Sequence, residues 1–266
     1  KEVSIDGEKY YFLHSSEESL LAWTNWNKAI KRLEFPQPVT LPETPITFEV
    51  FEEGETDSLI LAVKNQDTNE SSLHVVKAGR KLTLNEGTKL IDIPEKHELS
   101  KIKVVDLDLN GKPDIICFYE YKDPQVYIPN SENQYELLQD NTILNGMLSD
   151  ADHDNINSFN LENIDSNIIV QSEYARIFNL TEDGLQIDYQ ITGPEPDVDY
   201  SDALSGKFHG GIQGLVLKNN DTKQLEFFSY LEYQDGFVFE FKSDTYSSFS
   251  SSDRLFAEDL NGDGAD

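Results

Sequence analysis

Residues 106–120 read DLDLNGKPDIICFYE, an acidic loop that runs directly into an apolar segment. A hard cation such as calcium takes about six to eight oxygen ligands, and a tight loop can supply them from alternate residues. Positions one, three, five, seven and nine of this loop are Asp106, Asp108, Asn110, Lys112 and Asp114. Lys112 can offer only its backbone carbonyl, and Gly111 at position six permits the positive φ of a sharp turn. The loop therefore predicts a calcium site.

The residues after the loop exclude the best-known calcium motif. An EF-hand needs a bidentate Glu at position twelve and a helix on each side of its loop. Position twelve here is Cys117, inside the apolar run 115–118. Such a short apolar run is typical of a buried strand. We therefore expect the loop at the entrance to a strand and Cys117, the one cysteine of the chain, as a buried small hydrophobe.

The end of the sequence repeats the ligand pattern. Residues 259–266 read DLNGDGAD, which places the expected ligands at Asp259, Asn261, Asp263 and, through its carbonyl, Ala265. Position nine would be residue 267, so we expect the parent chain to continue and to supply an Asp there. A third acidic stretch, DADHDNINS at 150–158, has suitable spacing but lies upstream of the expected slot, and both a metal loop and a solvated acidic loop stay open for it.

Strand-like segments recur along most of the chain. Four of them align in order: DSLILAV from residue 57, DIICFYE from 114, NIIVQSE from 167 and GLVLKNN from 214. Each is expected as the first strand of a unit and is followed by a second strand, a polar turn and a third strand, which in the first unit is RKLTL at 80–84. A period of about 50 residues is typical of the four-stranded sheets of propellers. The sequence thus predicts an all-β fold, a β-propeller with four to five blades present.

The first 45 residues follow a different pattern. Ser15 and Glu18 form a capping box, and apolar residues follow at helical spacing, which predicts one helix over about 16–33. Trp23 and Trp26 lie on its apolar stripe. Four prolines between 36 and 45 predict an extended connector. We therefore expect an N-terminal helical segment with a connector at 1–45 and propeller blades at 46–266, truncated at the C-terminus.

The charge of the chain restricts its partners. There are 50 Asp and Glu residues against 21 Lys and Arg, and the formal net charge is -29. A field of this sign repels nucleic acid and anionic membrane surfaces, so neither is expected as a partner. No run approaches the length and apolar character of a membrane span, so no membrane insertion is expected from this segment.

Taken together, VVDLDLNGKPDIICF, the following VYIPNSENQYELL and the final FAEDLNGDGAD resemble the FG-GAP or VCBS repeats of integrin-alpha-type β-propellers. The resemblance covers about residues 46–266. It implies a ring of seven blades, loops that join neighbouring blades and hold one calcium ion each, and an exported protein at the cell surface or outside the cell. It also implies a calcium-stabilised scaffold that binds a protein or glycan ligand in adhesion or surface recognition.

Two further functions stay open beside the binding module. The chain is expected either to act as a structural shell or spacer of a larger secreted protein, such as a toxin-complex component, or as an accessory propeller of a polysaccharide-degrading enzyme. No catalytic constellation stands out: His209 in FHGGIQG has no accompanying G-x-S-x-G nucleophile motif. We therefore expect no enzymatic activity from these residues.

Overall fold

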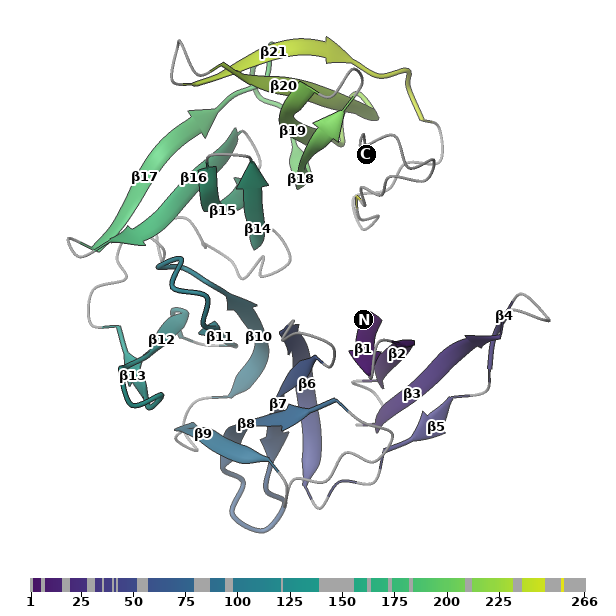
Figure 1. Cartoon of the computed structure of the whole chain (residues 1–266), viewed down its shortest axis with the longest axis vertical. Helices are drawn as coiled ribbons and strands as arrows, with labels where there is room; N and C mark the ends of the chain where they lie inside the picture. The colour runs from purple at the N-terminus through teal and green to yellow at the C-terminus, as the bar shows by residue number, and fades with distance from the viewer. Residues whose placement is uncertain are drawn as a thin grey trace. The chain divides into compact units, whose positions relative to one another are not determined.

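The computed structural model consists of β-strands joined by turns and loops (Figure 1). Its description covers residues 2–5, 8–15, 20–27, 32–34, 36–39, 41, 43–51, 57–78, 87–93, 98–120, 122–138, 156–161, 164–171, 174–181, 184–208, 212–231, 236–246 and 255. Within these ranges every regular element is a strand, which confirms the all-β class. The described residues form no helix with the length and apolar character that crossing a bilayer requires.

The N-terminal sheet replaces the predicted helix. Its strands are β1 (Glu2–Ile5), β2 (Glu8–Ser15), β3 (Leu20–Asn27), β4 (Arg32–Leu33) and β5 (Gln37–Pro38). Strands β1 to β4 lie in chain order, and β5 pairs with β3. The helix expected over 16–33 is therefore wrong, because residues 20–25 pair antiparallel with β2 from Tyr10↔Asn25 to Ser15↔Leu20.

Side-chain packing explains why strand geometry prevails in this segment. Phe12 and Leu21 are buried, and Trp23 packs against the same core with its ring centroid 5.8 Å from that of Tyr10. Trp and Thr are poor helix formers and favour half-buried pleated surfaces. The helical spacing of the apolar residues was thus outweighed by cross-strand pairing, and Thr24 is buried although it lay on no apolar stripe.

Four further sheets repeat one strand order, each with its four strands in sequence (Figure 1). The second sheet contains β6 (Thr44–Phe51), β7 (Ser58–Lys64), β8 (Ser71–Lys77) and β9 (Thr88–Ile93). The third contains β10 (Leu99–Val105), β11 (Asp114–Tyr119), β12 (Gln125–Pro129) and β13 (Tyr135–Leu137). The fourth contains β14 (Ile156–Leu161), β15 (Ile164–Gln171), β16 (Tyr174–Thr181) and β17 (Gly184–Ile191). The fifth contains β18 (Tyr200–Phe208), β19 (Ile212–Asn219), β20 (Gln224–Leu231) and β21 (Gly236–Lys242).

The repeat predicted from the sequence is present but displaced by one strand. The four segments expected as first strands are β7, β11, β15 and β19, the second strand of each sheet. The actual first strands, which the sequence analysis did not predict, are β6, β10, β14 and β18. The segment RKLTL at 80–84, expected as the strand after β8, lies outside the described residues. The described strand that follows β8 and pairs with it is β9. Residue 46, where we expected the blades to begin, lies inside β6.

The described chain divides into two compact units, residues 1–104 with 113–139, and residues 105–112 with 140–266. In the first unit, β7 contributes to two cores. Leu59, Leu61 and Val63 belong to the core shared with Phe12 and Leu21 of the N-terminal sheet. Ile60 and Ala62 belong to the core shared with residues of β10 and β11. Successive side chains of a strand point to opposite faces, so the second sheet packs on both of its neighbours.

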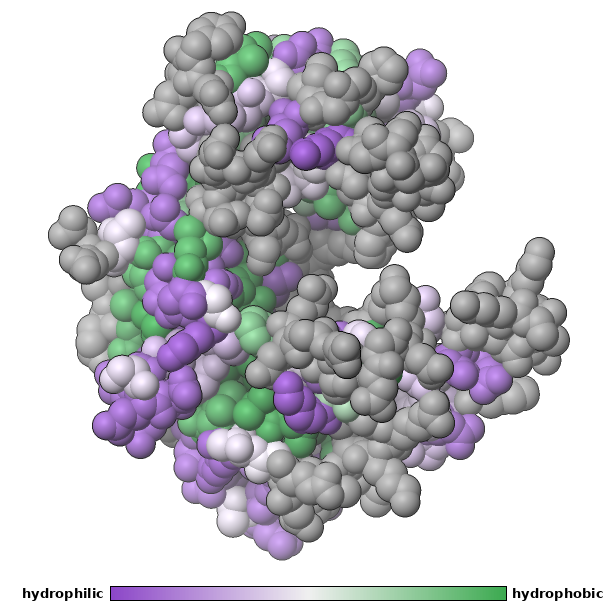
Figure 2. Space-filling model, viewed as in Figure 1, coloured by the Kyte–Doolittle hydropathy of each residue, from purple (hydrophilic) through white to green (hydrophobic). Residues whose placement is uncertain are grey.

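The second unit has a core of the same kind. Ala175 and Ile177 on β16 pack with Leu215 and Leu217 on β19 and with Phe228 on β20. The fourth sheet therefore stacks on the fifth, as the second sheet stacks on the third. Figure 2 shows that much of the coloured surface is hydrophilic, with hydrophobic residues in smaller patches. This agrees with the net charge of -29.

Candidate functional site

The predicted cation loop, residues 106–114, connects β10 to β11 and enters the strand at Asp114. Both strands belong to the third sheet and are neighbours in it. The loop thus joins two strands of one sheet, whereas the resemblance implied a connection between neighbouring blades. The expectation that the loop stands at the entrance to a buried strand is confirmed, since all six residues of β11 are buried.

Three carboxylates converge in this loop. Asp106, Asp108 and Asp114 can each place one oxygen so that all three lie within 4.8 Å of one another, and no other such group of acids, histidines or cysteines is found among the described residues. Asp106 and Asp108 are half-buried, and Asp114 is fully buried. Like charges at this spacing repel one another unless a cation or a proton lies among them. The acidic ligands expected at positions one, three and nine are thus brought together.

The loop is also ordered by its own hydrogen bonds. The backbone N–H of Asn110 donates to Asp106 Oδ1 at 2.9 Å, and that of Gly111 donates to Asp106 Oδ2 at 2.7 Å. The Asn110 side-chain amide donates to Asp108 Oδ2 at 2.7 Å. Asn110 Oδ1 in turn accepts the backbone N–H of Lys112 at 2.8 Å. The side chains expected as ligands therefore also define the turn.

Two residues of the loop adopt positive φ. Gly111 has φ of 79°, as its position in the motif predicted, and a Cβ there would meet nothing within 4 Å. Its glycine is therefore needed for the backbone conformation alone. Leu109 has φ of 57° and is 41% exposed, which is unusual for a bulky apolar residue. No feature of the loop motif predicted the positive φ of Leu109.

The electrostatics of the loop disfavour extra negative charge. Burial raises the pKa of Asp106, the hydrogen bonds from Gly111 and Asn110 oppose the rise, and the charge of Asp108 adds to it. Burial, assisted by the charge of Asp114, raises the pKa of Tyr135 to about 12. The Tyr135 hydroxyl donates to the Pro113 carbonyl oxygen at 2.8 Å, just before Asp114. A bound cation would lower the pKa of Asp106 by direct attraction.

Within the second unit, two residues of the fourth sheet hold the main chain at the start of the loop. The Asn167 side chain on β15 donates from Nδ2 to the Asp106 carbonyl oxygen at 2.9 Å. The backbone N–H of Leu180 on β16 donates to the Leu107 carbonyl oxygen at 2.7 Å, and Leu107 is fully buried. Sequence reasoning missed both anchors, since neither residue belongs to a ligand motif.

The donor set fits a hard cation. It offers carboxylate oxygens from three acids and an amide oxygen from Asn110, which are the ligands that calcium prefers. A buried amide oxygen, Asn167 Oδ1, is also found beside the loop and has no hydrogen-bond partner among the described residues. Lys112 lies at position seven of the loop, where only its backbone carbonyl suits a cation.

The other predicted metal positions belong to parts of the chain that the structure does not describe. Asp259, Asn261, Asp263 and Ala265 lie outside the described residues, as does the stretch containing Asp150, Asp152 and Asp154. The corresponding connections of the fourth and fifth sheets are residues 162–163 and 209–211. Each of these connections has fewer residues than the nine of the loop 106–114.

Comparisons with known proteins address the fold. No family model matches the chain, and no curated protein matches its sequence. Among solved structures, the chain is similar to a protein from Lactobacillus plantarum determined by the Northeast Structural Genomics Consortium. The TM-score is 0.53 at 12% sequence identity, over 91% of this chain and 68% of that one. At this identity the likeness concerns the fold alone.

Proposed function

We propose that this chain is part of a β-propeller that binds calcium at the loop 106–114 and serves as a recognition module for a protein or glycan ligand. The observation that carries the calcium site is the convergence of Asp106, Asp108 and Asp114 within 4.8 Å. The resemblance of the loop and its flanking strands to FG-GAP or VCBS repeats supports the same assignment.

The propeller assignment rests on repetition and stacking. Four sheets have the same sequential strand order, and in each unit neighbouring sheets share a buried core. A sheet of this size cannot bury its faces alone and is stable only in a stack. Propellers meet this need with blades of four strands. The likeness to the L. plantarum protein agrees with an all-β repeat architecture.

The recognition role is supported by aromatic side chains on the fifth sheet. The rings of Phe227 and Phe241 stack with centroids 4.4 Å apart, and Phe208 meets Phe227 edge-on at 5.6 Å. Phe241 is 49% exposed on β21, a strand at the edge of the sheet. Exposed aromatic rings are enriched in binding surfaces, because they bury a large apolar area at low entropic cost. This surface suits the apolar face of a sugar ring or of a peptide.

The proposed module works outside the cell or at its surface. Calcium sites in extracellular modules have dissociation constants of about 0.1–1 mM, which a loop of few ligands can reach. The acidic surface would keep the module soluble there and away from anionic membranes.

Calorimetric titration of calcium into chelator-treated protein tests the metal assignment. Binding to the native state alone adds about 2.7 kcal/mol of stability at a calcium concentration a hundredfold above Kd. We expect EDTA to lower Tm, calcium to restore it and magnesium to restore it poorly, because magnesium demands stricter octahedral geometry. Asp108→Ala should remove most of the response, and Asp123→Ala, an exposed acid outside the loop, should leave it intact. A wild-type protein that ignores calcium would refute the site.

A glycan array separates the two ligand classes. Wild-type protein and Phe241→Ala are compared in calcium-containing buffer. If the aromatic surface binds sugars, the variant should lose the signal that the wild type gives while keeping its Tm. An array on which the wild type binds nothing would refute the glycan branch of the proposal.

A further inference from the structure

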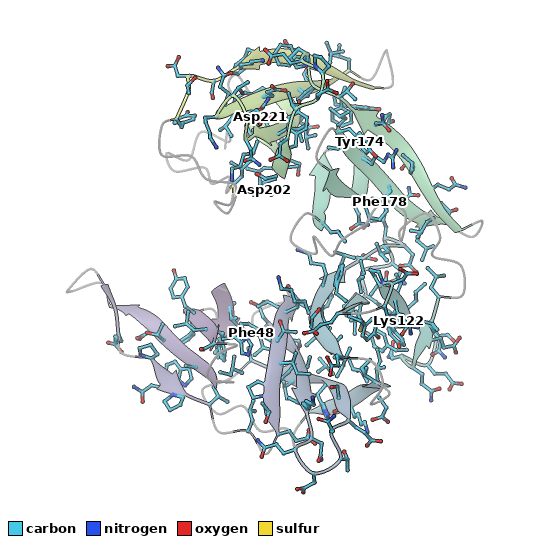
Figure 3. The ribbon with its side chains drawn as sticks, turned by 180° about the vertical axis from the view of Figure 1, so that it is seen from behind. Phe48, Lys122, Tyr174, Phe178, Asp202 and Asp221 are labelled. Carbon is cyan, nitrogen blue, oxygen red and sulfur yellow. The ribbon has the colours of Figure 1, made fainter. Side chains whose placement is uncertain are left out.

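Asn167 is a buried amide directed at the cation loop. It is 1% exposed, and its Nδ2 donates to the Asp106 carbonyl oxygen from 61 positions further along the chain. On β15 it pairs with Phe178 of β16, which Figure 3 labels. Its Oδ1 has no hydrogen-bond partner among the described residues. A buried polar atom of this kind carries a desolvation cost that packing alone does not explain.

A second contact fixes the neighbouring peptide. The Leu107 carbonyl oxygen accepts the Leu180 backbone N–H at 2.7 Å, and the Leu107 side chain is fully buried. Two consecutive carbonyls, those of Asp106 and Leu107, are thus held by two strands of the fourth sheet. They lie at the first and second positions of the loop, where the first carboxylate ligand is presented.

We propose that Asn167 is a positioning residue for the cation loop: it holds the main chain of Asp106 so that the carboxylates converge, and cation binding is thereby coupled to docking of the loop on the fourth sheet. This inference rests on the proposed calcium site. It assigns a role to a neutral residue outside the loop, which the ligand motif does not contain.

The coupling follows from the energetics of the loop. Without a cation, the charges of Asp106, Asp108 and Asp114 favour a spread arrangement. An external hydrogen bond that holds Asp106 in place reduces the ordering that the ion must otherwise impose, so affinity rises through preorganisation. Linkage requires the reverse as well, and the bound ion must strengthen the docking of the loop.

Replacing Asn167 with Leu separates positioning from a merely structural role. Leu has a similar volume, removes the donor to Asp106 and also removes the buried oxygen without a partner. A net hydrogen bond of ordinary strength corresponds to a rise in calcium Kd of about three- to tenfold. We expect that rise, and a smaller calcium-induced increase in Tm, while Tm in EDTA changes little. A structural role alone would shift Tm equally with and without calcium.

Asn179→Leu is the matched control. Asn179 lies on β16 of the same sheet, its Nδ2 donates to Asp188 at 3.0 Å, and its Oδ1 likewise has no hydrogen-bond partner among the described residues. It makes no hydrogen bond to the cation loop within the described structure. Its replacement should leave the calcium Kd unchanged, so an equal loss in both variants would count against the proposal.

Hydrogen exchange of the Leu180 amide provides a readout that needs no variant. The Leu180 N–H donates to the Leu107 carbonyl oxygen, so calcium should slow exchange of this amide in the wild type. The slowing at Leu180 should be at least as large as the slowing at neighbouring amides of β16. In Asn167→Leu the calcium dependence should weaken. If calcium leaves Leu180 exchange unchanged, docking and binding are independent and the inference is wrong.

The outcomes distinguish this inference from the function beneath it. A wild type that does not bind calcium overturns both. A wild type that binds calcium, together with Asn167→Leu of unchanged Kd and unchanged Leu180 exchange, overturns the positioning role and leaves the calcium site standing. If the calcium Kd rises in Asn167→Leu but not in Asn179→Leu, and exchange at Leu180 depends on calcium, the results support both the calcium site and the positioning role.

Discussion

The hydroxyl of Tyr200 donates a 2.6 Å hydrogen bond to Oε2 of Glu226, and both side chains are buried in the fifth sheet. The other carboxylate oxygen, Oε1, accepts the Asn219 side-chain amide at 2.8 Å and lies 3.6 Å from Lys242 Nζ. Burial, assisted by the adjacent Glu226, raises the pKa of Tyr200 far above its ordinary value. The buried carboxylate is thus fully hydrogen-bonded, as an interior charge requires.

Tyr200→Phe should destabilise the protein by about 1.5–3 kcal/mol, the range for a hydrogen bond to a charged group. The substitution keeps the ring in the core and removes only the donor to Glu226. Urea unfolding measures the change. Tyr174→Phe is the control, since the Tyr174 ring lies under the Arg176 guanidinium and its hydroxyl makes no hydrogen bond to a buried carboxylate among the described residues. Equal stability of Tyr200→Phe and wild type would contradict the assigned contact.

Gly193 packs against the same pair, because a Cβ built there would overlap the Tyr200 hydroxyl. We expect Gly193→Ala to cost about 1–3 kcal/mol through overpacking. In a Tyr200→Phe background the hydroxyl is absent, so the same substitution should cost less. A double-mutant cycle measures this coupling. Strictly additive costs would show that Gly193 and Tyr200 do not compete for the same space.

Cys117 should resist thiol reagents in the native protein. Its side chain is fully buried, and burial raises the pKa of its thiol to about 12. Thiol reagents attack the thiolate, which is scarce at such a pKa. Labelling by an aromatic disulfide should therefore be slow in buffer and rapid in urea, and its rate should follow unfolding of the first unit. Rapid labelling of the folded protein would disprove the burial.

His74 should make the protein less stable at mildly acidic pH. Burial lowers the pKa of His74 below its ordinary 6.5. The negative charges of Glu43 and Asp92 act against this decrease, and the positive charge of Lys89 adds to it. As pH falls below 6.5, the unfolded chain binds a proton that the folded chain resists, so stability is lost. His74→Gln removes this contribution. The stability difference between wild type and variant, measured by urea unfolding, should shift in favour of the variant as pH falls; a constant difference would contradict the prediction.

Strand repetition and the acid loop could be predicted because both depend on local sequence. The runs around Ile60, Ile115 and Leu215 are continuously apolar, which is typical of strands that are buried on both faces. The side chains between Asp106 and Asp114 form the hydrogen bonds that shape the turn, so the motif itself predicts the loop. First strands such as β10 escaped detection because only Leu99, Ile102 and Val105 of LSKIKVV are buried, and this spacing of three lacks the period-two alternation that marks a half-buried strand.

The features that were missed depend on distant parts of the chain. Residues around Trp23 have helical spacing, and only pairing with β2 makes them a strand. Asn167 contacts the loop across 61 positions, a relationship that no local motif records. The Tyr200–Glu226 pair likewise joins two strands of the fifth sheet that are not adjacent in chain order.

The unequal first connections of the sheets bear on how such a chain can change over time. Strands β14 and β15 are neighbours in their sheet with residues 162–163 between them, and β10 and β11 are neighbours in theirs with residues 106–113 between them. The strand order of a sheet is therefore compatible with a short or a long first connection. If the loop 106–114 binds calcium as proposed, an engineer who grafts 106–113 between the first two strands of another sheet could add calcium dependence to that sheet separately from its strand order.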